Sequence, residues 1–182
     1  MDRYAPLRRR TIALVGLMGV GKSSVGRRLA NALDLPFRDT DSEVEAAAGR
    51  SISDIFSDLG EDAFREGERR VIARLLDQEP HVLATGGGAF MNPQTRALIK
   101  SRAVSVWLKT DLTILARRVA RKDSRPLLIG KDPMEVLQAQ ALARYPAYGE
   151  ADVTVEAGDE AHHVTVEQLI RALGAHLEAD AS

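Results

Sequence analysis

The chain has 182 residues, of which 45% are hydrophobic and 28% are charged, as in a single soluble domain with a sizeable core. A formal net charge of −1 argues against nucleic acid or a membrane surface as a partner, and the absence of cysteine excludes disulfides, thiolate catalysis and cysteine zinc sites. No apolar run is long enough to span a bilayer, and none follows the basic start "MDRYAPLRRR" as a secretory signal requires, so we expect a cytoplasmic protein.

Short apolar runs alternate with amphipathic segments of helical length along the chain. Runs rich in β-branched residues predict buried strands at 11–17, 82–85 and 104–108, and weaker runs predict strands at 35–39 and 151–156. Helical spacing and capping residues predict helices starting near Lys22, over 61–78, from Asn92-Pro93, over 112–121 and over 166–179. Strands that alternate with helices indicate an α/β domain with a parallel sheet covered on both faces.

The stretch "GLMGVGKSS" lies between the first predicted strand and a helix, and it fits the pattern G-x-x-x-x-G-K-[ST] from Gly16 to Ser23. Glycines let backbone amides approach a phosphate, and the helix N-terminus adds its positive end. Lys22 can reach the terminal phosphates, and the Ser23 hydroxyl can ligate magnesium. The pattern favours a nucleoside-triphosphate site over a glycine-rich turn with a chance lysine. The residues expected to contact the nucleotide here are Gly19, Val20, Gly21, Lys22, Ser23 and Ser24.

Two further clusters follow predicted strands, at the sheet edge where parallel sheets bind their ligands. The sequence "DTD" puts Asp39 and Asp41 two residues apart in an extended segment, so both side chains can point the same way. One carboxylate could serve magnesium and the other accept a proton, although either could instead cap the following helix. The sequence "TGGG" indicates close backbone approach to a small ligand, with a plain turn as the alternative; its glycines are Gly86, Gly87 and Gly88.

These segments, with "SISDIF…GEDAFREGE" and "SRPLL", stand in the order and spacing of the shikimate kinases, and the chain resembles that family from about residue 11 to about residue 148. The resemblance implies a single P-loop kinase domain of the nucleoside-monophosphate-kinase-like fold, with five parallel strands. It divides residues 1–182 into a core with the phosphate loop (11–38 and 81–112), a substrate-binding helical segment (39–75), a lid (118–132) and a C-terminal core (133–182).

The resemblance also implies an activity: transfer of the ATP γ-phosphate to the 3-hydroxyl of shikimate, with magnesium, on the way to chorismate and the aromatic amino acids. In this family pattern Asp41 contacts the substrate hydroxyls and is the candidate general base, and Asp39 lies near magnesium through water. Arg65 holds the substrate carboxylate, for which a planar guanidinium is well suited. Glu68 lies three residues later and can orient that arginine, while the backbone of Gly87 contacts the substrate.

The other arginines of the pattern lie further along the chain. Arg125 matches the lid arginine that closes over the phosphates, and Arg144 matches a second arginine for the substrate carboxylate. Arg118 is expected to contact the nucleotide, although Arg117 matches equally well. The solvated helix faces are expected to carry Arg69, Arg70, Arg74 and Arg171.

The resemblance weakens after residue 150, where "EAGDEAHH" (156–163) lacks the arginine or asparagine that the family often places beside adenine. Either the backbone of Ala157 and Gly158 holds the base, or nucleotide preference is relaxed. His162 and His163 have no third ligand at a credible spacing and are expected at a helix start, not at a metal. No exposed apolar stripe is evident, so a monomer is expected.

Three alternatives to a shikimate kinase stay open from the residues. A kinase for another small polyol acid, gluconate above all, would use a similar loop and fold. A nucleoside-monophosphate kinase is disfavoured because "DTD" would repel a substrate phosphate. A catalytically silent nucleotide-binding protein would be expected to have lost part of the phosphoryl-transfer machinery, and no such loss is seen.

Overall fold

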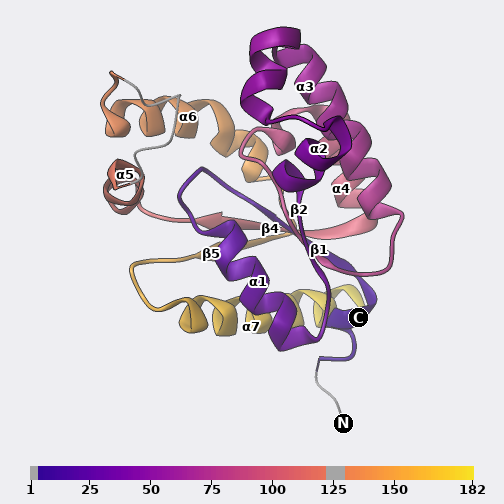
Figure 1. Cartoon of the computed structure of the whole chain (residues 1–182). Coiled ribbons are helices and arrows are strands. Elements are labelled where there is room, and N and C mark those ends of the chain that lie inside the picture. The colour runs from indigo at the N-terminus through magenta and orange to yellow at the C-terminus, as the bar shows by residue number, and fades with distance from the viewer. Residues whose placement is uncertain (1–3, 122–129) are drawn as a thin grey trace.

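The computed structural model describes residues 4–121 and 130–182, and it is built around one sheet of five parallel strands (Figure 1). The strand order is β2-β3-β1-β4-β5. After β1 the chain adds β2 and β3 on one side of β1, and then β4 and β5 on the other side. This confirms the predicted α/β fold with a five-stranded parallel sheet. The strands are β1 (Thr11–Val15), β2 (Phe37–Asp39), β3 (Val82–Ala84), β4 (Ala103–Lys109) and β5 (Val153–Glu156).

Burial along the strands explains their sequences. Every residue of β1 and β3 is buried, as their continuous apolar runs predict for strands covered on both faces. The edge strand β5 alternates buried and exposed residues, so its sequence lacks the continuous apolar run that predicts β1 and β3. The first strand ends at Val15, two residues earlier than predicted, because the chain turns at Gly16. A Cβ on Gly16 would lie only 2.6 Å from the carbonyl oxygen of Leu108, so the turn requires glycine.

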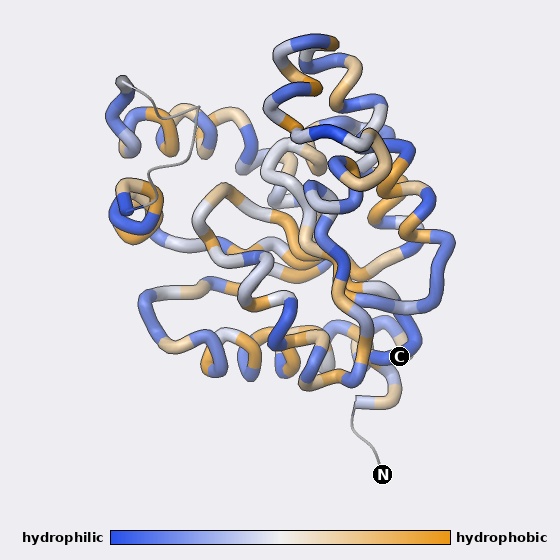
Figure 2. Tube along the Cα trace, in the orientation of Figure 1, coloured by the Kyte–Doolittle hydropathy of each residue, from blue (hydrophilic) through white to orange (hydrophobic). Residues whose placement is uncertain are grey.

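Helices cover both faces of the sheet, with α1 and α7 packed together on one side and α3, α4 and α6 on the other (Figure 1). Apolar residues concentrate along the strands and on the inward-facing sides of these helices (Figure 2). Within residues 4–121 and 130–182, no helix combines the length and apolarity needed to cross a membrane. The helices are α1 (Lys22–Leu33), α2 (Thr40–Ala48), α3 (Ile52–Leu76), α4 (Pro93–Arg102), α5 (Leu112–Ala120), α6 (Pro133–Tyr148) and α7 (His162–Asp180), with short 3-10 turns η1 (Leu7–Arg9) and η2 (Ala89–Met91).

Two helices differ from the sequence prediction. The helix predicted over 61–78 is the second half of α3, which starts at Ile52 after a Ser51 cap and bends at Gly60. Gly60 has φ 82° and ψ 173°, so it breaks the 3.6-residue periodicity that the prediction followed. Helix α6 has no counterpart among the predicted runs, since its interior Pro146 reads as a helix breaker.

A buried histidine gives the fold a pH dependence. His81 is 1% exposed; its Nδ1 lies 2.9 Å from the Glu79 carbonyl oxygen, and its Nε2 has no hydrogen-bond partner among the described residues. Burial, with a smaller effect from Arg38, lowers the pKa of His81 below its usual range. The native state therefore keeps this imidazole neutral at pH values where the unfolded chain already binds a proton.

We therefore expect the free energy of unfolding to fall as pH decreases below about 6.5, by at most about 1.4 kcal/mol per pH unit from this group. His81→Asn keeps a donor for the Glu79 carbonyl but removes the titration, so the slope between pH 7 and pH 5.5 becomes smaller. Urea unfolding at both pH values measures it, with the exposed His163→Asn as the control. An unchanged slope in His81→Asn would contradict the role of this residue.

Candidate active site

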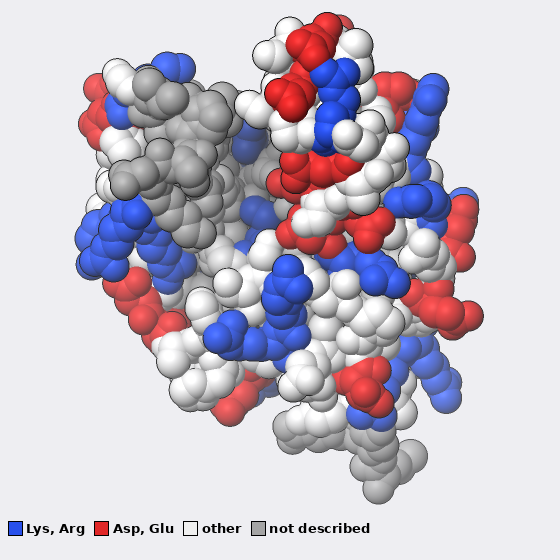
Figure 3. Space-filling view, viewed as in Figure 1, with Lys and Arg blue, Asp and Glu red and all other residues white. Residues whose placement is uncertain are grey.

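The three predicted clusters meet at one edge of the sheet. The phosphate loop follows β1, Asp39 ends β2, and residues 85–88 follow β3; these strands are parallel neighbours, so their carboxyl ends lie side by side. Together they line a cavity of about 240 Å³. Acidic side chains gather over α2, below the tip of α3, and basic atoms lie in the adjoining depression (Figure 3). The cavity is lined by Met18, Gly19, Gly21, Lys22, Ser23, Ser24, Asp39, Asp41, Thr85, Gly86 and Gly87.

The phosphate loop has the conformation that its glycines predict. Gly19 and Gly21 have φ of 79° and 95°, in the region that disfavours side chains, and Gly21 stands at the N-cap of α1 without a side-chain cap. The N-terminus of α1 thus faces the loop with its backbone amides and the positive end of the helix dipole, a combination that suits an anion. Lys22 folds across the loop, and its Nζ donates to the carbonyls of Gly16 (2.6 Å) and Leu17 (2.9 Å). Val20 is 3% exposed, so its side chain belongs to the core.

The two candidate magnesium ligands lie next to each other. The Ser23 hydroxyl donates to Asp39 Oδ2 at 2.7 Å. Asp39 Oδ1 also accepts from the amides of Asp41 (3.0 Å) and Ser42 (3.3 Å), so this residue caps α2 while it faces Ser23. A hydroxyl and a carboxylate are oxygen donors of the kind that Mg²⁺ prefers. No group of three or more metal-binding side chains occurs in the described part of the chain.

Asp41 lies in the first turn of α2, because the helix starts at Thr40. The extended backbone predicted for the pair ends at Asp39, so it is wrong for Asp41. The predicted alternative of a helix cap is confirmed for Asp39, and both residues line the same cavity, as their spacing predicted. Asp41 is open to the cavity, but the surrounding protein desolvates its carboxyl group and thereby raises its pKa, and Asp39 raises it further. Lys22 and Arg65 act in the opposite direction. A carboxylate with a raised pKa is a better proton acceptor.

Arg65 and Glu68 form the predicted pair on α3. Arg65 Nη1 donates to Glu68 Oε1 at 2.9 Å, and Glu61 lies 3.7 Å from Arg65 Nε. Glu68 is 2% exposed, and its Oε2 has no hydrogen-bond partner among the described residues. Burial raises the pKa of Glu68, and Arg65 partly offsets this effect. The prediction that Glu68 shares a helix face with Arg65 and orients it is confirmed.

The glycine turn, Gly86 to Gly88, lies against three side chains of the candidate site. Each glycine faces a different side chain, and an added Cβ at each position would collide with that side chain. The Cβ would lie 2.9 Å from Asp41 Oδ1 at Gly86, 2.9 Å from Arg144 Nη1 at Gly87, and 2.7 Å from Arg65 Cζ at Gly88. The turn thus gathers the acidic and basic candidates of three helices around one small volume.

Contacts within the protein distinguish the two candidate arginines, Arg117 and Arg118. Arg118 Nη2 donates to the Gly158 carbonyl at 2.7 Å, and its Nη1 lies 3.4 Å from the Gly19 carbonyl of the phosphate loop. Arg117 is 60% exposed and pairs with Asp159 at 2.8 Å. Arg118, not Arg117, therefore lies beside the loop. His162 starts α7, as predicted; burial lowers its pKa, and so do the charges of Arg28 and Arg118.

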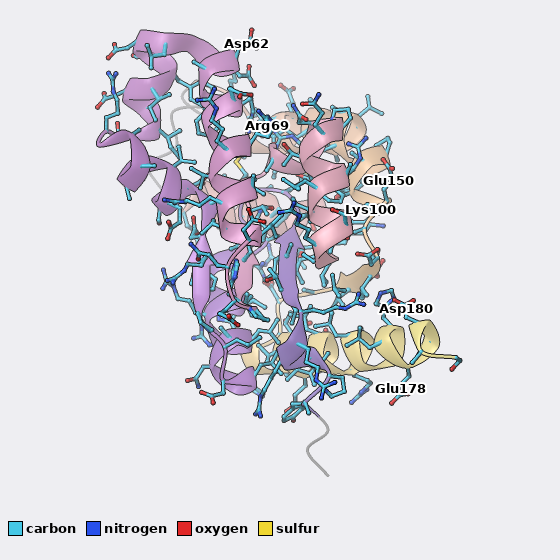
Figure 4. All side chains as sticks on the ribbon, turned by 90° about the vertical axis from the view of Figure 1, so that its right-hand side faces the viewer. Asp62, Arg69, Lys100, Glu150, Glu178 and Asp180 are labelled. Carbon is cyan, nitrogen blue, oxygen red and sulfur yellow. The ribbon has the colours of Figure 1, made fainter. Side chains whose placement is uncertain are left out.

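The remaining predicted arginines lie either on exposed helix faces or outside the described residues. The arginines expected on solvated faces are there: Arg69 pairs with Glu66 at 2.7 Å and projects from the outer side of α3 (Figure 4). Arg125 and most of the expected lid (118–132) lie outside the described residues.

Two contacts beside the glycine turn were not predicted from the sequence. Tyr148 donates its hydroxyl to the Gly87 carbonyl. Arg96 Nη1 donates to the carbonyls of Phe90 (2.9 Å) and Met91 (3.2 Å), directly after the glycine turn. The spacing of Tyr148 four residues after Arg144 could have revealed the first, because such residues share a helix face. No sequence pattern predicts the contacts of Arg96, because its partners are backbone carbonyls, which every residue has.

Comparison with known proteins identifies what the chain resembles. The family described as "Shikimate kinase" matches residues 18–174. A shikimate kinase from Caulobacter vibrioides (strain NA1000 / CB15N) is 72% identical over 172 residues, covering 94% of this chain and 86% of the relative. One from Paramagnetospirillum magneticum is 55% identical, covering 99% and 94%. The solved structure of shikimate kinase from Acinetobacter baumannii in complex with shikimate has a TM-score of 0.88 at 34% identity, covering 94% of this chain and 97% of that one.

Proposed function

The chain belongs to the shikimate kinase family, and from this premise we propose that it transfers the γ-phosphate of ATP to the 3-hydroxyl of shikimate, giving shikimate 3-phosphate. One observation carries the proposal: Asp41, Arg65 and Arg144 converge on the glycine turn, beside the phosphate loop. This arrangement suits a small hydroxylated acid. The two guanidinium groups can bind its carboxylate, while the carboxylate of Asp41 faces its hydroxyls.

The substrate end of the site is prepared before substrate binds. Arg65 is held by Glu68, so little side-chain freedom remains to be lost on binding. Arg144 comes from a different helix, α6, and lies at Gly87. Two arginines that approach from different helices fix the direction of a carboxylate as well as its position.

At the reaction centre, Asp41 accepts the proton of the substrate hydroxyl as that oxygen attacks the γ-phosphorus. Lys22 stabilises the negative charge on the transferring group, and Arg118 contacts the nucleotide. Ser23 and Asp39 would hold Mg²⁺, which neutralises charge on the phosphates when bound. From the family resemblance we propose that Arg125 closes over the phosphates and excludes water. The cytoplasmic location and the monomeric state stay predictions.

The test is ADP release from Mg·ATP with shikimate, gluconate or a nucleoside monophosphate as acceptor. We expect release that depends strongly on shikimate and stays at background with the other two. Turnover with gluconate but not with shikimate would mean that the arginines bind an acid as proposed but that the ring is not the substrate. Turnover only with the monophosphate would overturn the proposal.

Gly88→Ala tests how the glycine turn supports the substrate arginine. Gly88 has φ −97° and ψ −7°, which alanine adopts without strain, but the new methyl group displaces the Arg65 guanidinium. We expect the KM for shikimate to rise about tenfold and the KM for ATP to stay the same, since a charged hydrogen bond is weakened. Gly174→Ala in α7, where a Cβ meets nothing within 4 Å, is the control and leaves both constants unchanged. Equal KM values for shikimate in the two variants would contradict the prediction.

A further inference from the structure

Tyr148 links the end of α6 to the glycine turn. It is the last residue of α6 and is fully buried, and its hydroxyl donates to the carbonyl oxygen of Gly87, 61 residues away in sequence. Arg144, one helical turn earlier on α6, lies beside the same peptide, since a Cβ on Gly87 would lie 2.9 Å from its Nη1. The buried hydroxyl thus contacts the backbone of the turn at the residue against which the Arg144 guanidinium lies.

The chemistry of the turn explains why such a contact matters. A run of three glycines has more conformational freedom than any other tripeptide, and without side chains it cannot be fixed by packing. A hydrogen bond to the Gly87 carbonyl fixes the orientation of the whole peptide plane between Gly87 and Gly88, because that plane is rigid. The neighbouring peptides have their own bonds, from the Gly86 amide to Thr40 Oγ1 at 2.9 Å and from the Met91 amide to the Gly88 carbonyl at 3.1 Å, so Tyr148 orients the one peptide between Gly87 and Gly88.

We propose that Tyr148 is a positioning residue for shikimate: its hydroxyl sets the Gly87 peptide and the Arg144 guanidinium in the relative arrangement that binds the substrate. The inference rests on the proposed function, in which Arg144 and Gly87 contact shikimate. Tyr148 does not reach the reacting atoms, so its loss affects substrate binding and not the transfer step.

A second connection holds α6 in place without this hydroxyl. Arg96 Nε of α4 pairs with Glu150 Oε2 at 2.9 Å, just after the end of α6, and Glu150 lies beside α4 (Figure 4). The Tyr148 ring also packs near Trp107, with ring centroids 5.8 Å apart. Phenylalanine keeps this packing, so Tyr148→Phe removes the hydroxyl and leaves the helix attached.

The experiment compares Tyr148→Phe with Tyr145→Phe, which removes a hydroxyl from the same helix. No hydrogen bond of the Tyr145 hydroxyl occurs within the part of the chain that the structure describes. In Tyr148→Phe we expect the KM for shikimate, and its Kd by calorimetry, to rise about three- to tenfold. The kcat and the KM for ATP stay within about twofold. Tyr145→Phe matches the unmodified protein in all four values.

An unchanged KM and Kd for shikimate in Tyr148→Phe would overturn the inference, and so would a fall in kcat at constant KM. Arg144→Ala separates this failure from failure of the proposed function. If Arg144→Ala weakens shikimate binding and Tyr148→Phe does not, only the role of Tyr148 is wrong. If neither variant weakens it, the assignment of Arg144 is wrong as well.

Discussion

Asp41→Asn lowers kcat by about 10²- to 10⁴-fold and leaves the binding of Mg·ATP nearly unchanged, because the variant loses a general base and keeps the shape of the site. Asparagine fits the same space beside Gly86, where Asp41 Oδ1 limits the room for a Cβ. It cannot accept the hydroxyl proton. Coupled measurement of ADP release gives kcat, and calorimetry with a non-hydrolysable ATP analogue gives the nucleotide affinity.

The pH profile of the unmodified protein supports the same test. The pKa of Asp41 is raised, first by burial and then by the neighbouring Asp39, so the base becomes protonated at a higher pH than an ordinary aspartate. Activity should therefore fall on the acid side as this group takes up its proton, and the residual activity of Asp41→Asn should lack that limb.

The matched control is Asp62→Asn, the same chemical change on the outer side of α3 (Figure 4). It should leave kcat and ATP affinity unchanged. Near-normal kcat in Asp41→Asn would remove Asp41 from the role of base. A loss of ATP affinity that parallels the loss of kcat would instead place Asp41 among the nucleotide contacts.

Arg65→Ala raises the KM for shikimate by about 10- to 100-fold, with a smaller change in kcat and none in the KM for ATP. Two effects add up. The substrate carboxylate loses a charge-assisted contact, and the buried Glu68 loses its partner at 2.9 Å. The pKa of Glu68, already raised by burial, should rise further without the arginine charge.

Steady-state kinetics with each substrate varied in turn measures the effect. Arg69→Ala serves as the control, because Arg69 lies on the same helix, faces outward and pairs only with Glu66 among the described residues. A rise in the KM for ATP with an unchanged KM for shikimate would show that Arg65 belongs to the nucleotide and not to the acid.

The parts of the site that lie close together in sequence could be predicted from it. The phosphate loop is one contiguous pattern, and Arg65 and Glu68 are neighbours on one helix, so local spacing was sufficient. The glycines at 86–88, which have no local reason, also pointed to this region, and Gly86 and Gly87 line the cavity. Their actual reason, three side chains from α2, α3 and α6 in the space of the missing Cβ atoms, depends on tertiary structure.

The errors have the same origin. Asp39 has two roles, helix cap and neighbour of Ser23, and the sequence pattern could not combine them. The first half of α3 was not predicted because Gly60 interrupts its helical pattern, and α6 was not predicted because it contains Pro146. Because α6 was not among the predicted helices, the spacing of four residues between Arg144 and Tyr148 was not used, and the contact of Tyr148 with Gly87 was not predicted.

The glycine turn has a consequence for inhibition and drug resistance. Most binding sites can escape an inhibitor by exchanging one side chain for another, but the wall formed by Gly86–Gly88 has none to exchange. Any replacement there introduces a Cβ into space that Asp41, Arg144 or Arg65 already occupies, so the change that expels the compound also displaces a side chain of the proposed substrate site. Against a compound that binds the backbone of this turn, we therefore expect resistant variants to bind shikimate more weakly.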